Sequence, residues 1–280
     1  MSDLTLMAVH AHPDDESSST GGVFARYSEE GMNTVLVTCT NGELGDGPEH
    51  VKPDEDGHDP QQVAKTRLAE LDVAVAKLGI AHLEVLGYHD SGMADWRFKN
   101  DDHAFAAVPF EESTGRLVQL FDHYRPDVVI TYHDNGGYNH PDHLQAHHIT
   151  VAACERTGIP SKLYFIARRR RDWEKMREAL LARGIDIPTP LQNMDDEQRK
   201  QWEERMAAVE QLITTTVDTL PYAEQKRAAL AAHASQLDES WWVKMPNDSF
   251  GDVFAEESFI RAFDRTGVPV PETDLFDGLR

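Results

Sequence analysis

The amino-terminal stretch LTLMAVHAHPDDE, residues 4–16, decides the fold, because it joins a buried strand to a polar turn. Residues 4–11 form a short apolar run of the kind found in parallel strands that are covered on both faces. Four later runs have the same character and are predicted as strands: 34–40, 82–86, 128–132 and 163–167. These five runs indicate a parallel sheet.

Helix-length segments fill the intervals between the predicted strands. Apolar residues recur at three- and four-residue spacing in four of them: 22–30, 62–78, 111–124 and 144–157. Strand and helix alternate for about 165 residues, which predicts an α/β fold with a doubly wound, mainly parallel, Rossmann-like sheet. Ligands bind such sheets in a crevice at the carboxyl ends of the strands.

Two regions of the chain depart from this alternation. Residues 41–60 are dense in Gly, Pro, Asp and Glu, and we expect a long exposed loop that could act as a mobile lid. From Asp172 onward the pattern is mainly helical and strongly charged. We therefore predict a catalytic α/β core over residues 1–170 and a carboxyl-terminal helical elaboration over 171–280 that completes the same domain.

Composition excludes several kinds of partner. The 280 residues contain 27 Lys and Arg against 49 Asp and Glu, a net charge of −22, which repels nucleic acids and anionic membranes. Asp3 and the lack of a basic n-region argue against a signal peptide, and no run approaches the roughly 18 apolar residues of a membrane span. Cys39 and Cys154 are too few for a disulfide framework, so we expect a cytoplasmic protein.

Two clusters of imidazole and carboxylate groups follow the first and fourth predicted strands. HAHPDDE occupies residues 10–16, and HDNGGYNHPDH occupies residues 133–143. Taken alone, each could be a polar turn in which an Asp caps the next helix. Their matched positions at one sheet edge favour a catalytic zinc site, which takes three His or carboxylate ligands and leaves one position for water.

These motifs resemble those of the LmbE/PIG-L deacetylase family, whose zinc enzymes hydrolyse N-acyl glucosamine linkages. The resemblance rests on AHPDDE at 11–16 and HPDH at 140–143. Supporting matches span most of the chain: Gly42-Glu43, Arg67-x-x-Glu70, Asp90-Ser-Gly-Met93 and His233-Ala-Ser-Gln236. The resemblance implies an LmbE-like fold.

The resemblance also implies roles for individual side chains. It makes His12, Asp15 and His143 the zinc ligands, and leaves Asp14 as the general base. Two His and one carboxylate also suit Fe²⁺.

Around these ligands, the resemblance implies further catalytic groups. His140 would stabilise the oxyanion or protonate the leaving amine, with Asp142 orienting its ring and Tyr138 contacting the same oxygen. His10 and His147 compete as ligands by spacing, but we interpret them as packing or supporting residues.

Four residues are candidate substrate contacts. They are Arg67, Asp90, Glu43 and Ser19. The alternatives are a local ion pair between Arg67 and Glu70 and a simple turn cap at Asp90. The basic run 168–171 and the pair at 241–242, two tryptophans, are weaker candidates, because such groups usually form a solvated face or pack.

Within the family, the resemblance points to the mycothiol branch. It implies cleavage of the amide of an N-acyl glucosamine, either a mycothiol S-conjugate or N-acetylglucosaminyl-inositol. The opening residues, the 135–143 loop and the terminal PETDLFDG at 271–278 look like the amidase side of that branch, whereas Ser19 replaces its usual Lys. Alternatives are a deacetylase of a secondary metabolite and a non-catalytic sugar- or metal-binding module. The expected partner is a small amino sugar, with the oligomeric state left open.

Overall fold

A single mixed sheet organises the protein. The structure is a computed structural model that describes residues 4–182, 184, 194–237, 245 and 247–280. The seven strands found there lie in the order β3-β2-β1-β4-β5-β7-β6. Their bounds are β1 Thr5–His10, β2 Asn33–Thr40, β3 His82–Tyr88, β4 Val128–Thr131, β5 Lys162–Ala167, β6 Thr215–Asp218 and β7 Glu256–Asp264. The first five strands pair in parallel, which confirms the predicted doubly wound, mainly parallel sheet.

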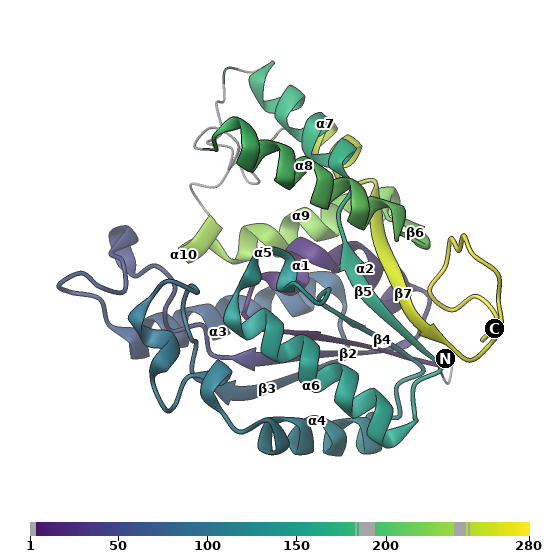
Figure 1. The fold of residues 1–280 in the computed structure, drawn as a ribbon, viewed down its shortest axis with the longest axis horizontal. Helices are drawn as coiled ribbons and strands as arrows, with labels where there is room; N and C mark the ends of the chain where they lie inside the picture. The colour runs from purple at the N-terminus through teal and green to yellow at the C-terminus, as the bar shows by residue number, and fades with distance from the viewer. Residues whose placement is uncertain (1–3, 183, 185–193, 238–244, 246) are drawn as a thin grey trace.

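Helices cover both faces of this sheet (Figure 1). Those that pack on it include α2 Gly21–Glu29, α3 Pro60–Leu78, α4 Phe110–Tyr124, α6 Pro141–Thr157 and α9 Ala223–Ala232. Helices α2, α3 and α9 share one buried apolar cluster with the sheet, and α4 and α6 share another. Helix α3 shows why the boundaries are sharp: Asp59 caps its first turn, and Gly79 ends it in a left-handed conformation.

The strand order places the site. It reverses between β1 and β4, since the chain runs outward from β1 to β2 and β3 on one side and from β4 to β5 on the other. Connections leaving β1 and β4 therefore turn to opposite faces and leave a crevice between them. Both sequence clusters, at 10–16 and 133–143, start at this crevice.

The carboxyl-terminal third is less purely helical than its sequence indicates. Helices α7 Arg170–Leu181 and α8 Asp196–Gln211 lie where helices were predicted. Strands β6 and β7 were missed: β7 pairs antiparallel with β5, and β6 with β7. A Thr-rich strand of four residues gives little periodicity, and β7 interleaves polar with apolar side chains. Residues after 171 thus extend the sheet as well as covering it.

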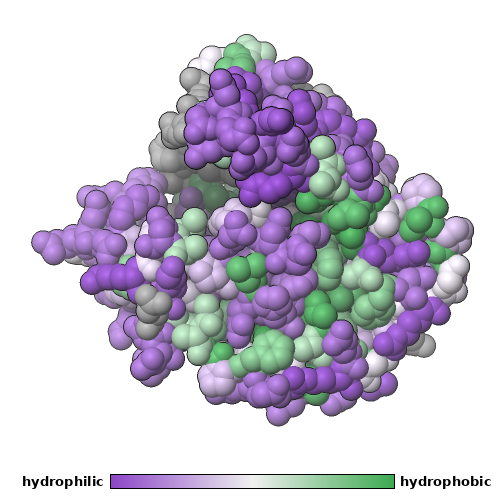
Figure 2. Space-filling view, in the orientation of Figure 1, coloured by the Kyte–Doolittle hydropathy of each residue, from purple (hydrophilic) through white to green (hydrophobic). Residues whose placement is uncertain are grey.

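The surface agrees with the acidic composition. Figure 2 shows a face that is mostly hydrophilic, with small apolar areas scattered over it. Helix α8 has no buried residue. Within the described part of the chain, no helix is long and apolar enough to span a membrane.

Candidate metal centre and active site

The turn after β1 brings His12 and Asp15 together. Asp15 Oδ2 accepts hydrogen bonds from the His12 backbone N–H at 2.9 Å and from the Tyr132 hydroxyl at 2.6 Å. The same hydroxyl accepts the backbone N–H of Ala11 at 2.6 Å. Tyr132 directly follows β4, so this one side chain joins the ends of the two strands that flank the crevice.

The loop after β4 presents His143 to the same point. His143 Nδ1 lies 2.9 Å from the Gly136 carbonyl oxygen. Because a carbonyl only accepts, Nδ1 carries the proton and Nε2 offers a lone pair. Gly136 has φ 60°, and a Cβ there would lie 2.9 Å from the His143 Cβ. Glycine is therefore the residue that lets the loop approach this closely.

Two of the spacings among the predicted ligands suit a metal ion. Asp15 Oδ2 lies 3.4 Å from His12 Nδ1 and 3.5 Å from His143 Nε2. Ligand atoms bound to a tetrahedral zinc at about 2.1 Å lie about 3.4 Å apart. His143 Nε2 is buried and has no hydrogen-bond partner. An orphaned imidazole nitrogen facing a carboxylate fits a divalent cation.

Each of these imidazoles is also held from behind. His12 Nε2 lies 3.2 Å from Asp142 Oδ2, and His143 Nδ1 is held by Gly136. Such outer contacts fix the orientation of metal-binding imidazoles and their tautomer. Both rings are thereby set to present one nitrogen toward Asp15.

Other groups with ligand character crowd the same crevice. Two sets have ligand atoms within 4.8 Å of one another: His12, His140 and His143; and His12, Asp90, His140 and Asp142. Asp15 belongs to neither set, although its Oδ2 lies 3.5 Å from His143 Nε2. The cluster thus contains more potential ligands than a catalytic zinc uses.

Asp14 stands beside the ligands with an unusual backbone. Its φ is 118° and ψ −25°, and although it precedes helix α1, Asp15–Ser19, its side chain makes no capping bond. Its carboxylate instead lies 3.0 Å from Arg67 Nη2. Burial raises the pKa of Asp14 above its usual value, although Arg67 opposes this. The carboxylate is therefore placed as a proton acceptor and not as a helix cap.

The pKa values of Asp15 and His12 shift in the direction opposite to the one that burial alone would give. Burial raises the pKa of Asp15, but His143 and His12 hold it well below its usual value. Burial lowers the pKa of His12, while Asp90 and Asp142 raise it well above its usual value. The crevice thus keeps Asp15 ionised, as a metal ligand must be.

His140 is a hydrogen-bond donor toward the crevice. It caps α6: its Nδ1 accepts the backbone N–H of Asp142 at 3.2 Å, so the proton of the neutral ring lies on Nε2. Burial lowers its pKa to about 3, so the ring is neutral near pH 7. Tyr138, on the short helix α5 Gly136–Asn139, is exposed, and its ring centroid lies 5.8 Å from that of His140.

We predicted that the Asp142 carboxylate orients the His140 ring, and this prediction is wrong. The carboxylate accepts the Ser91 backbone N–H at 2.9 Å and the Ser91 hydroxyl, and contacts His12. The first turn of α6 directs the side chain toward β3 and β1, so only its backbone reaches His140. Asp142 therefore orients His12.

Arg67 lies inside the site and not at its mouth. It is buried, and its guanidinium donates to the Gly42 and Pro13 carbonyls, both at 2.7 Å, as well as to Asp14. The ion pair with Glu70 considered above does not form in this arrangement, because Glu70 accepts the backbone N–H and hydroxyl of Ser235. Arg67 thus organises the turn that carries Asp14.

Asp90 and Glu43 line the crevice from the loops after β3 and β2. Asp90 Oδ1 accepts the Gly92 N–H at 2.8 Å, as a turn cap would, and also lies 3.7 Å from His12 Nε2. Glu43 Oε1 lies 2.7 Å from His89 Nδ1, and its buried Oε2 has no hydrogen-bond partner. That second oxygen is available to a ligand.

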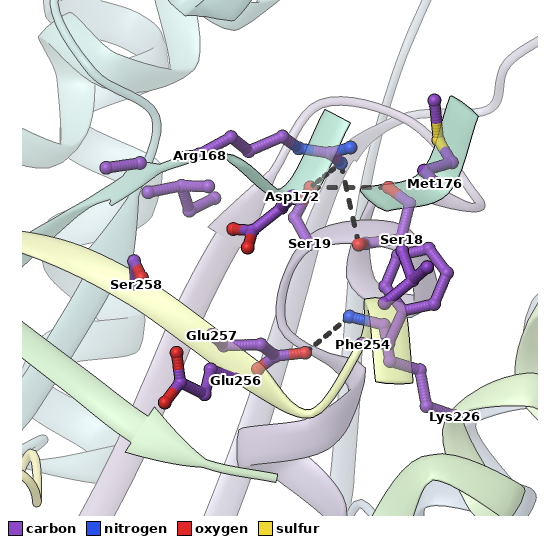
Figure 3. A pocket seen from close by; sticks show the side chains of 13 residues that line it. Ser18, Ser19, Arg168, Asp172, Met176, Lys226, Phe254, Glu256, Glu257 and Ser258 are labelled. Atoms are coloured by element: carbon purple, nitrogen blue, oxygen red, sulfur yellow. Dashed lines mark hydrogen bonds and ion pairs between the residues drawn. The ribbon is translucent and has the colours of Figure 1, made fainter. Parts of the chain in front are cut away.

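Ser19 lies away from the metal cluster, at the far end of α1. It lines a cavity of about 60 Å³ with Arg168, Asp172 and Phe254 (Figure 3). Arg168, at the end of β5, reaches to within 3.5 Å of the Ser19 hydroxyl. The cavity is therefore a neighbour of the crevice, separated from it by one short helix.

The remaining candidates have other partners. His10 Nε2 contacts the Thr20 hydroxyl at 2.9 Å, and His147 Nδ1 contacts the Tyr132 carbonyl at 2.8 Å, so both support the site from behind. Arg169 and Arg171 pair with Glu256, and Arg170 with Glu174. The tryptophans at 241 and 242 lie outside the described residues.

Sequence reasoning missed Tyr132, Ser91, Glu16 and His233. Tyr132 ended a predicted strand, and Ser91 and His233 appeared only within motifs. Glu16 was seen as part of the first cluster but received no role. The signal that could have found them is adjacency to motif residues, since each contacts the turn carrying residues 11–16 or a ligand's support.

Fold and site together define an enzyme of the hydrolase class, built around a cluster of side chains that could hold a metal ion. The comparisons agree. A model of the family described as PIG-L, GlcNAc-PI de-N-acetylase, matches residues 7–154. This chain belongs to that family, and the resemblance expected from the sequence is confirmed.

Similar proteins match nearly the whole chain. The mycothiol S-conjugate amidase of Streptomyces coelicolor is 35% identical and covers 99% of this chain and 98% of its own. The 1D-myo-inositol 2-acetamido-2-deoxy-alpha-D-glucopyranoside deacetylase of Mycobacteroides abscessus is 37% identical, over 100% and 99%. The structure of N,N'-diacetylchitobiose deacetylase from Pyrococcus horikoshii has a TM-score of 0.59 at 16% identity, covering 92% and 83%, and supports the fold alone.

Proposed function

We propose that this protein is a zinc-dependent hydrolase that cleaves the amide of an N-acyl glucosamine. One observation carries the proposal: Asp15 Oδ2 lies at coordination spacing from His12 Nδ1 and His143 Nε2, with the Asp14 carboxylate on the adjacent residue. The pKa of Asp15 is lowered, which suits a metal ligand, whereas the pKa of the adjacent Asp14 is raised, which suits a general base.

His12, Asp15 and His143 would hold the metal. His140 is the nearest competitor, but its Nδ1 is engaged by the α6 backbone and its Nε2 carries a proton, so it suits hydrogen-bond donation better than ligation. When bound, zinc supplies Lewis acidity toward a carbonyl oxygen and toward water. Fe²⁺ fits the same ligands.

The side chains divide the proton transfers. Asp14 accepts a proton from the attacking water, and its raised pKa brings it nearer to the value that suits a general base. The Nε2–H of His140 stabilises the oxyanion that forms at the amide carbon. As the C–N bond breaks, the proton that Asp14 took from the water passes to the nitrogen of the departing amine. Tyr138, exposed beside His140, can approach the same oxygen as its loop moves. The products are a carboxylic acid and a free amine.

The substrate is proposed from the relatives and the carboxylates of the crevice. Buried Asp90 and Glu43 present oxygens that accept hydrogen bonds from sugar hydroxyls. From the names of the relatives, the proposed substrate is N-acetylglucosaminyl-inositol or a mycothiol S-conjugate. Ser19 and its cavity lie one five-residue helix from Asp15, a distance that the remote part of such a conjugate could span.

A paired assay tests the function and the substrate. Zinc-loaded protein is incubated with N-acetylglucosaminyl-inositol and with a mycothiol S-conjugate, and amine release is followed by mass spectrometry. We expect turnover of at least one, with loss of about 100-fold or more in kcat for Asp14→Ala. A deacetylase of another metabolite would cleave neither but would cleave other N-acetylglucosaminyl compounds, whereas unchanged turnover in Asp14→Ala would refute the mechanism.

A non-catalytic sugar- or metal-binding module is the other candidate. It would bind zinc or an amino sugar but release no amine from any N-acyl glucosamine. Binding alone would not require Asp14 to point at the ligands on a strained backbone. Isothermal titration beside the turnover assay separates the two.

A further inference from the structure

The peptide group between Pro13 and Asp14 forms a hydrogen bond at each of its two ends. Arg67 Nη2 donates to its carbonyl oxygen at 2.7 Å. Its N–H, which belongs to Asp14, donates to Glu16 Oε2 at 3.0 Å. The C=O and the N–H point from opposite edges of one rigid peptide plane, so the two contacts together fix how that plane is rotated.

That rotation is one that the chain would not adopt by itself. Asp14 has φ 118° and ψ −25°, on the side of conformational space where an L side chain meets its own backbone and outside the small left-handed helical region. Residues stay in such conformations only where their surroundings impose them. Relaxing φ would swing the Asp14 carboxylate away from the ligands.

Glu16 is itself held by the far end of the chain. Its side chain is fully buried, its Oε1 lies 2.8 Å from His233 Nε2, and it also accepts the Ser17 hydroxyl. Both carboxylate oxygens are therefore engaged, Oε1 by His233 and Ser17 and Oε2 by the Asp14 N–H. His233 is also fully buried, directly after α9.

We propose that Glu16 and His233 are positioning residues that hold Asp14 in its working orientation through the Pro13–Asp14 peptide, an inference that rests on the proposed role of Asp14 as base. His233 contacts Glu16 at hydrogen-bond distance, and Glu16 accepts the Asp14 N–H. Arg67 donates to the carbonyl at the opposite end of the same peptide. Neither Glu16 nor His233 needs to touch substrate.

The neighbouring contact of the same segment offers a matched control. Ser235 binds Glu70 on α3 through its backbone N–H and hydroxyl, both at 2.7 Å. This anchor fastens the residues after α9 but makes no contact with the Pro13–Asp14 peptide. Glu70→Ala therefore loosens the segment without releasing Asp14.

Steady-state kinetics separate positioning from simple support. For Glu16→Ala and His233→Ala, each saturated with zinc, we expect kcat to fall by about 100-fold, as a misplaced reacting group costs, with KM and zinc stoichiometry changed less than about threefold. Glu16→Gln keeps an oxygen for the Asp14 N–H and should recover at least about 10-fold of the loss. If Glu16→Ala does not fold, His233→Ala and Glu16→Gln carry the comparison.

Equal kcat losses in Glu70→Ala and Glu16→Ala would overturn the inference, because general loosening would then explain both. A kcat within about threefold of the parent in His233→Ala would overturn it as well.

A crystal structure supplies a readout that does not depend on turnover. In zinc-loaded Glu16→Ala or His233→Ala we expect Asp14 to relax to negative φ and the Pro13 carbonyl to leave Arg67. Retention of φ near 118° in the variant would overturn the inference even if no substrate were ever found. Absence of turnover in the parent protein, by contrast, would refute the proposed function and leave this structural outcome to decide the inference.

Discussion

Replacing Gly136 by Ala should weaken metal binding through a residue that is not a ligand. The new Cβ would lie 2.9 Å from the His143 Cβ and 3.3 Å from the Leu144 backbone nitrogen, so the loop must move. Its carbonyl would then release His143 Nδ1, now 2.9 Å away. Losing the outer partner of a metal-binding imidazole typically costs 10- to 100-fold in affinity, or about 1.4–2.7 kcal/mol.

Gly137→Ala is the matched control, because Gly137 has φ 79° and open space where a Cβ would go. Both positions have a positive φ, which disfavours Ala, but only at Gly136 would the new Cβ meet the His143 side chain. Zinc affinity is measured by competition with a chromophoric chelator, at fixed pH. Equal affinities for the two variants would refute the argument that close approach of the loop orients His143.

Three further outcomes follow from buried contacts. Tyr132→Phe removes the donor to Asp15 and leaves the Ala11 N–H without its acceptor, so unfolding by urea should show a loss of about 1–3 kcal/mol; no loss would mean that water replaces the hydroxyl. Zinc at 100 times its Kd should stabilise the protein by about 2.7 kcal/mol over the chelator-treated form, and equal melting temperatures would argue against a metal site. Lys162→Met removes the buried ammonium that lies 2.6 Å from Glu272 but leaves Arg261 3.1 Å from the same carboxylate, so it should cost about 1.5–3 kcal/mol in the same urea experiment; no loss would mean that Arg261 alone balances the charge.

The sheet was predictable because parallel strands buried on both faces are continuous apolar runs. The edge that carries the site was predictable for the same reason, since polar clusters that follow two such strands must meet at their carboxyl ends. β6 and β7 escaped because one is four residues long, and the other, EESFIRAFD, is neither a continuous apolar run nor a strict alternation of polar and apolar side chains. Sequence periodicity reports burial, and both β6, at the sheet edge, and β7, beside it, are buried unevenly.

Side-chain direction set the limit within the site. The family resemblance implied a contact between the Asp142 carboxylate and the His140 ring, but the start of α6 turns the carboxylate toward Ser91 and His12. Glu16 and His233 are 217 positions apart, and no local pattern joins them. Such contacts are properties of the packed chain.

The pairing of β7 with β5 also bears on how the protein is made. All three proposed ligands leave the ribosome before residue 150, whereas β7 begins at Glu256. Until β7 emerges, β5 is an edge strand with unpaired N–H and C=O groups, a template for joining other nascent chains. A fragment cut after residue 170 would keep the motifs at 11–16 and 140–143 and all three proposed ligands yet carry that open edge, so we expect it to aggregate and not to fold.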